Sequence, residues 1–66
     1  MQIKLNGEDF VIEGGATVAQ LLHALDIQPQ RVALEVNMYI VKRADYQTYE
    51  IKEGDTIEVV NLVGGG

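Results

Sequence analysis

The sequence predicts an α+β domain in two layers, a small mixed β-sheet with one main helix packed on one face. Two observations predict it. Stretches of alternating apolar and polar residues, typical of half-buried strands, lie on both sides of one stretch that has the apolar spacing of a helix. The chain of 66 residues has room for one hydrophobic core, so these elements are expected to pack together.

The N-terminal segment predicts a β-hairpin. "QIKLN" at 2–6 alternates polar and apolar residues, and "DFVIE" at 9–13 does so again, with Phe10 and Ile12 as its inward-facing side chains. Asn6-Gly7 lies between them and is the strongest short signal for a hairpin, because both residue types accept the positive φ of a tight turn.

The next segment predicts the helix. Thr17 is a good N-cap, and the helix is expected to end around Asp26, because Pro29 cannot continue it and disfavours helix at the preceding residue. The apolar residues at helical spacing, which form one face, are Val18, Leu21, Leu22 and Leu25.

The second half predicts further strands separated by an irregular connection. "RVALEVN" at 31–37 alternates, a tight turn follows at Asn37-Met38, and the short strand "YIV" continues from it. Residues 42–51 have little periodicity and are expected to cross one end of the sheet, with one helical turn and with Tyr39, Tyr46 and Tyr49 packing over it. "TIEVVNLV" at 56–63 is the last strand.

This order of elements predicts the β-grasp arrangement. A helical crossover from the hairpin to a neighbouring strand is expected to be right-handed and to create a parallel pair, which gives a mixed sheet with the first and last strands central. Residues 1–63 form this domain, and a flexible tail follows at 64–66.

Alternation along the last strand places Ile57 and Val59 under the helix, so Val60 and Leu62 take the open face. Isolated apolar residues on a surface are ordinary. Here they lie next to the tail, which makes Val60 and Leu62 a candidate patch for docking a partner protein.

Composition argues against several classes of function. Ten acidic and five basic residues give a net charge of -5, which repels nucleic acid. No apolar stretch approaches the roughly 20 residues of a membrane span, and the N-terminus does not resemble a signal peptide, so a cytoplasmic protein is expected. The chain has no cysteine and a single histidine, His23, so no metal site is expected.

The three glycines that follow the last strand suit one chemical task. Glycine has no Cβ, so its backbone can enter a narrow cleft, and three extended residues reach about 10 Å. A carboxylate at Gly66 becomes a good electrophile only after phosphoryl or adenylyl activation. No "GxxxxGK[ST]" loop is present, so a partner enzyme would have to supply the ATP, and no cofactor is expected on this chain.

Over its full length the chain resembles the ThiS family, the ubiquitin-like β-grasp sulfur carrier proteins of thiamine biosynthesis. The resemblance rests on "MQIKLNGE", "TVAQLL", "VALEVN", "KEGDTIEVV" and "VGGG" in this order. It implies a carrier rather than an enzyme, in which an E1-like adenylyltransferase uses ATP to adenylate the Gly66 carboxylate. Sulfur, mobilised from cysteine by a desulfurase in many systems, then replaces AMP to give a thiocarboxylate, from which thiazole synthase takes the sulfur. Gly65 would be the second residue of the Gly-Gly end, and Gly64 would extend the tail.

Two other interpretations stay open. The small subunit of molybdopterin synthase is another β-grasp sulfur carrier with a Gly-Gly end, usually in a somewhat longer chain. A stand-alone β-grasp binding module, in which the tail is irrelevant, is the other.

The chain departs from the family at the second tight turn, where Asn37-Met38 replaces the frequent Asn-Gly. Methionine resists the left-handed conformation, so we expect a turn of another type, with Met38 and Tyr39 forming a small exposed apolar spot.

Overall fold

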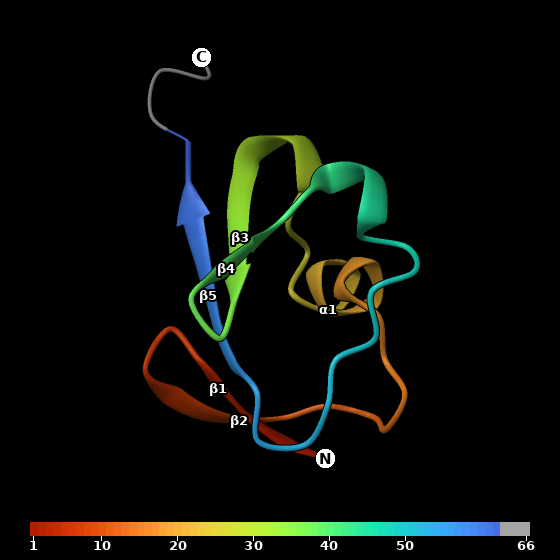
Figure 1. Cartoon of the computed structure of the whole chain (residues 1–66), viewed down its shortest axis with the longest axis vertical. Helices are drawn as coiled ribbons and strands as arrows, with labels where there is room; N and C mark the ends of the chain where they lie inside the picture. Colours follow the sequence, from red (N-terminus) through yellow and green to blue (C-terminus); the bar gives the residue numbers. More distant parts are fainter. Residues whose placement is uncertain (63–66) are drawn as a thin grey trace.

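The computed structural model describes residues 1–62 and contains the helix and strands that the sequence predicts (Figure 1). In chain order the elements are β1 (Gln2–Leu5), β2 (Glu8–Val11), α1 (Val18–Ala24), the 3-10 turn η1 (Pro29–Arg31), β3 (Val32–Val36), β4 (Tyr39–Val41), the 3-10 turn η2 (Arg43–Asp45) and β5 (Thr56–Asn61). The turn η2 is the helical turn expected in the irregular connection.

The five strands form one mixed sheet in the order β2-β1-β5-β3-β4. β1 and β5 are parallel, and the other neighbours are antiparallel. The first and last strands are central, as predicted. The strand that follows the helix, however, does not lie beside the hairpin, because β5 is inserted between β1 and β3 and forms the parallel pair itself. This insertion gives hydrogen-bonding partners to the inner edges of both β1 and β3, which would otherwise be unpaired.

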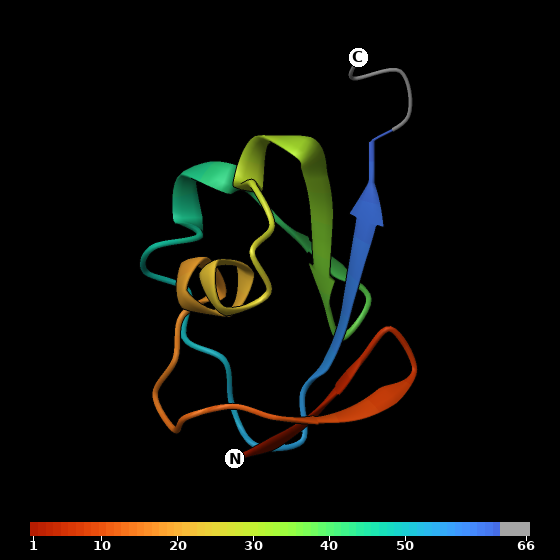
Figure 2. The ribbon, with the colours of Figure 1, turned by 180° about the vertical axis from the view of Figure 1, so that it is seen from behind.

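Helix α1 covers one face of the sheet, and the two layers are separate in Figure 2. The core lies between them: Val18, Leu21 and Leu22 of the helix are fully buried together with Ile3, Leu34 and Ile57 of the sheet. Leu25 is half-buried at the margin of this core. The apolar face predicted for the helix is therefore confirmed, with α1 ending at Ala24, two residues before Asp26.

A capping box starts the helix. The Thr17 Oγ accepts a hydrogen bond from the Gln20 backbone N–H over 3.2 Å, and the Gln20 Oε1 accepts one from the Thr17 N–H over 2.8 Å. These two bonds satisfy N–H groups that have no partner inside the helix. Thr17 is thus the N-cap that the sequence predicted.

The connection between β4 and β5 contributes to the core. Tyr46 and Ile51 are 4% and 2% exposed, so they close the space beside the helix. The prediction that the tyrosines pack over this connection is right for Tyr46 and wrong for Tyr39, which is 79% exposed. Tyr39 is the first residue of the edge strand β4, directly after the hairpin turn and outside the core.

The two hairpin turns have positive φ at both of their central residues. Asn6 and Gly7 have φ values of 50° and 84°, and Asn37 and Met38 have values of 51° and 75°. The expectation of a different turn at Asn37-Met38 is wrong. Val36 pairs with Tyr39, which leaves a two-residue loop, and the turn that fits strand twist in such a loop has positive φ at both positions. Pairing of the strands therefore overrides the preference of methionine.

Candidate functional site

Strand β5 supports the predicted carrier site. The backbone N–H of Leu62 donates a hydrogen bond to the carbonyl oxygen of Arg31 over 2.9 Å, so pairing with the β3 side continues to the last described residue. The predicted site residues Gly64, Gly65 and Gly66 lie outside the described residues, as does Val63. The part of the site that the structure describes is therefore the strand that precedes the glycines. The boundary between the domain and the tail stays a prediction.

The two faces of β5 differ in the predicted way. Ile57 is fully buried and Val59 is half-buried against the core, whereas Val60 and Leu62 are each 48% exposed. Alternation along the strand places Val60 on the face that the helix does not cover, and the hydrogen bond of Leu62 continues the same ladder. The exposure of the predicted docking residues is confirmed, and their docking role stays a prediction.

Two asparagine side chains hold β5 from both sides, and sequence reasoning did not single them out. The Asn6 Oδ1 accepts a hydrogen bond from the Val59 N–H over 2.8 Å, and the Asn37 Oδ1 accepts one from the Thr56 N–H over 2.9 Å. Asn37 also donates through its Nδ2 to the Asp55 carboxylate over 3.0 Å. Each asparagine occupies the first position of a hairpin turn, which is the one signal that could have drawn attention to them.

The charged side chains of the described residues form one ion pair and no metal-binding cluster. Among residues 1–62 the ion-pair distance is met only between the Lys4 Nζ and the Asp9 Oδ1, at 2.7 Å, and both side chains are exposed. The hydrogen bond and charge of Lys4 lower the pKa of Asp9. His23 is exposed on the surface of the helix, in contact with solvent. Within this part of the chain no group of His, Asp and Glu side chains could hold a metal ion.

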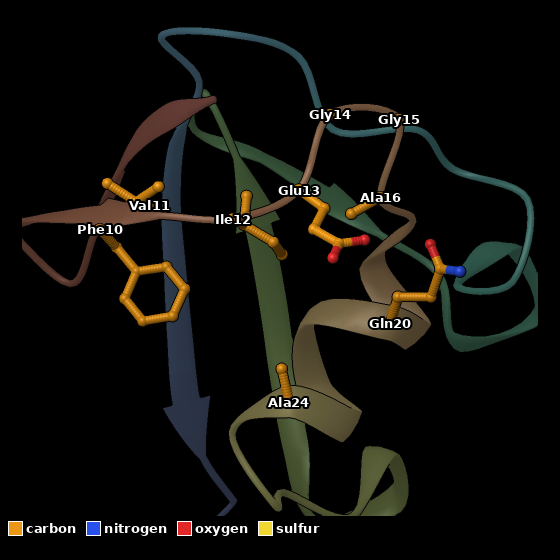
Figure 3. A pocket seen from close by; sticks show the side chains of 9 residues that line it. All are labelled: Phe10, Val11, Ile12, Glu13, Gly14, Gly15, Ala16, Gln20 and Ala24. Atoms are coloured by element: carbon orange, nitrogen blue, oxygen red, sulfur yellow. The ribbon is translucent and has the colours of Figure 1, made fainter.

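A hollow of about 460 Å³ lies between β2, the following loop and α1 (Figure 3). Phe10, Ile12 and Ala24 give it apolar walls, and its polar side chains are Glu13 and Gln20. A lone carboxylate and an amide do not form an acid–base pair, and none of the residues of β5 line the hollow. It is therefore not part of the carrier site.

The model of the ThiS family matches residues 3–66, nearly the whole chain and all three terminal glycines. The chain belongs to the ThiS family. It is 33% identical to the sulfur carrier protein ThiS of Escherichia coli over 66 residues, which cover 100% of both chains. The match favours this carrier over the molybdopterin synthase subunit and the stand-alone binding module.

A solved structure and a longer relative extend the comparison. The ThiS chain superposes on the crystal structure of the thiamine biosynthesis protein ThiS from Geobacter metallireducens with a TM-score of 0.86, at 30% identity and with 100% of both chains covered. The β-grasp fold of ThiS is thereby confirmed. The ThiS chain is also 44% identical over 66 residues to a thiazole synthase of Magnetococcus marinus. It spans 20% of the length of that protein and of a second thiazole synthase.

In the described residues no helix has the length and apolar composition needed to cross a membrane.

Proposed function

We propose that this chain carries sulfur to the thiazole ring of thiamine on the carboxylate of Gly66. An E1-like adenylyltransferase transfers AMP from ATP to this carboxylate, with release of pyrophosphate. A cysteine desulfurase is the proposed origin of the sulfur, which reaches the acyl adenylate as a persulfide on a partner enzyme. The outer sulfur of the persulfide attacks the acyl carbon, so that a C–S bond forms, the C–O bond to AMP breaks and an acyl disulfide results. A second thiol of the partner then cleaves the S–S bond, which releases the thiocarboxylate and leaves a disulfide on the partner.

The observation that carries this proposal is the match to the ThiS family through Gly66. Adenylation turns a carboxylate, which would have to expel oxide, into a mixed anhydride with a good leaving group. The described residues of this chain contain no cysteine that could carry the sulfur instead. Cytoplasmic localisation stays a prediction.

Thiazole synthase is the proposed acceptor of the sulfur. Two relatives that contain a segment similar to this entire chain are named thiazole synthase, at 44% and 35% identity. A carrier segment within the same polypeptide as the acceptor would raise its local concentration at the acceptor site. We assign the same partnership to this chain.

Val60 and Leu62 are the proposed docking residues for these partners. Their exposed side chains lie on the open side of the strand that runs directly to the tail. The four residues from Val63 to Gly66, at ~3.3–3.6 Å each, would allow the carboxylate to reach about 13–14 Å past Leu62 when fully extended. A partner that grips this surface could therefore receive the tail in a narrow active site.

Intact mass spectrometry tests the proposal. Incubation with the adenylyltransferase, ATP and a sulfur source is expected to increase the mass of the chain by one oxygen-to-sulfur exchange. An unchanged mass, under conditions that convert the E. coli sulfur carrier, would contradict it. The mass of the protein isolated from its source shows at the same time whether Gly66 is terminal.

Two tail variants separate length from composition. Deleting Gly66 leaves a Gly-Gly end but shortens the reach by about 3.5 Å, and misplacement of a reacting group by even 1 Å can reduce a rate about 100-fold. Gly64→Ala keeps the length and adds only a methyl group. We expect the deletion to lose conversion and Gly64→Ala to keep most of it. Equal conversion of the shortened chain would show that Gly66 is not the reacting residue.

A further inference from the structure

Two glutamates face each other on the open side of the sheet. Glu35 of β3 and Glu58 of β5 are direct partners in the antiparallel register. The neighbours of Glu35 along β3, Leu34 and Val36, are buried under the helix, as is Ile57 beside Glu58. Both carboxylates therefore lie on the uncovered face, where directly opposite side chains have Cβ atoms about 4.5–5.5 Å apart.

This pair is unfavourable in the isolated chain. Like charges directly opposite each other destabilise a sheet. Lys4 lies on the same face of the sheet, but its Nζ contacts Asp9 at 2.7 Å, and in the described part of the chain neither Glu35 nor Glu58 has a cation within ion-pair distance. The two carboxylates accept none of the side-chain hydrogen bonds found among these residues.

Exposed apolar side chains flank the two carboxylates. Ile40 of β4 pairs with Glu35 and is 72% exposed. Val60 follows Glu58 by two residues on the same face, is 48% exposed and pairs with Ala33. The open face thus carries a row of Ile40, Glu35 and Glu58 with Val60 beside it, and this group is called the Glu35–Glu58 patch below. Apolar neighbours of this kind can exclude water from an ion pair that a partner protein makes with the carboxylates.

We propose that the Glu35–Glu58 patch docks thiazole synthase through an arginine of that enzyme, inserted between the two carboxylates. A guanidinium has donors enough for both carboxylates in a fixed planar geometry, so it removes the repulsion that the free chain carries. The apolar residues around it exclude water from the ion pairs. This inference rests on the proposed function, which supplies the partner, and adds the chemistry by which the partner is recognised.

The patch is also continuous with the route of the tail. Val60 belongs to it, and Leu62 lies one step further along the same face towards Gly66. An enzyme surface that covers the patch would therefore lie over the strand from which the tail leaves. The net charge of -5 would further attract a basic surface and increase the association rate.

Binding of the double variant E35Q/E58Q to the thiazole synthase of the same organism tests the proposal, measured by isothermal titration calorimetry. Glutamine keeps the shape of each side chain and removes its charge. We expect binding to weaken by about tenfold or more, because each glutamine replaces a carboxylate that would accept a charge-assisted hydrogen bond from the arginine. We also expect the variant to unfold at a higher urea concentration than the wild type, because the repulsion is gone.

The matched control is E8Q/E50Q, which makes the same change in net charge. Both residues are exposed; Glu8 is at the edge strand β2, and Glu50 forms a bridge with Thr17 beside the helix. Binding to the synthase should remain close to that of the wild type. A loss as large as that of E35Q/E58Q would show a general effect of charge and overturn the proposal.

The remaining outcomes separate this inference from the proposed function. If the wild type is converted to the thiocarboxylate and binds the synthase, but E35Q/E58Q binds equally well, the patch is not the docking site and the carrier function stands. If E35Q/E58Q loses binding to the adenylyltransferase alone, the proposal assigns the patch to the wrong partner and is overturned. If the wild type is not converted at all, the proposed function itself fails.

Discussion

The backbone N–H of Val59 donates a hydrogen bond of 2.8 Å to the side-chain oxygen of Asn6, 53 residues earlier in the chain. The Asn6 Nδ2 donates a longer hydrogen bond to the Val59 carbonyl oxygen, at 3.4 Å. The Asn6 backbone N–H donates one to the Ile57 carbonyl oxygen, at 2.9 Å. The side-chain amide of Asn6 thus acts as one more peptide group of β1. It extends the parallel ladder to Val59 while the backbone already turns into the hairpin.

Asn6→Ala is expected to destabilise the domain by about 2 kcal/mol, because it loses these side-chain bonds and because alanine tolerates positive φ less well than asparagine does. Asn6→Gly keeps the backbone conformation and loses only the bonds, so its cost should be about 1 kcal/mol. Urea unfolding monitored by circular dichroism measures both. Equal losses for the two variants would show that the φ of 50° contributes nothing.

Met38→Gly is expected to stabilise the domain, although it removes a large apolar side chain. Met38 is 88% exposed and has a φ of 75°. The substitution therefore loses little packing and relieves a backbone conformation that only glycine adopts freely. Relief of about 1–2 kcal/mol is reduced by the greater entropy of unfolded glycine, which leaves a gain of about 0.5–1 kcal/mol. Met38→Ala is the control, because it removes the side chain but keeps the Cβ. An equal gain in stability for Met38→Ala would show that the gain comes from removing an exposed apolar side chain and not from relieving the backbone.

The features that the sequence predicted correctly are encoded by neighbouring residues. The cap at Thr17, the buried face of α1 and the alternation of Ile57 with Val60 each follow from the period of a single element. For the same reason the exposure of Val60 and Leu62 could be predicted before any strand was placed.

The features that could not be predicted from the sequence depend on contacts between residues that are distant along the chain. The parallel pairing of β1 with β5 rather than with β3, and the bonds of Asn6 and Asn37 to β5, exist only once β5 returns through the middle of the sheet. At Met38 the local preference of the residue pointed the wrong way, because pairing of Val36 with Tyr39 fixed the turn. The opposition of Glu35 and Glu58 likewise follows from register, which no single strand encodes.

Thr17→Ala is expected to cost about 1 kcal/mol, because the Gln20 backbone N–H loses the hydroxyl that accepts its hydrogen bond over 3.2 Å. Thr17→Ser keeps a hydroxyl in the same place and should cost much less. Thermal or urea unfolding of the two variants measures the difference. If serine and alanine were equally destabilising, the capping bond would not be the cause.

The contact between Lys4 and Asp9 predicts a dependence of stability on pH. The hydrogen bond and charge of Lys4 hold the pKa of Asp9 below its ordinary value of 3.8. The unfolded chain therefore binds this proton at a higher pH than the folded chain does. The contribution of Asp9 to stability is complete above pH 3.8 and is lost as the pH falls through the lowered pKa. It should be small and weaker in high salt, because the two side chains are 54% and 62% exposed.

Lys4→Met is expected to return the pKa of Asp9 towards its ordinary value, since methionine keeps much of the side-chain length but carries no charge and donates no hydrogen bond. An NMR titration that follows the Asp9 carboxyl carbon measures this pKa directly. Lys52→Met is the matched control, because it makes the same change in charge at an exposed lysine outside the pair. If the pKa of Asp9 stayed low in Lys4→Met, or rose equally in Lys52→Met, the contact at 2.7 Å would not be its cause.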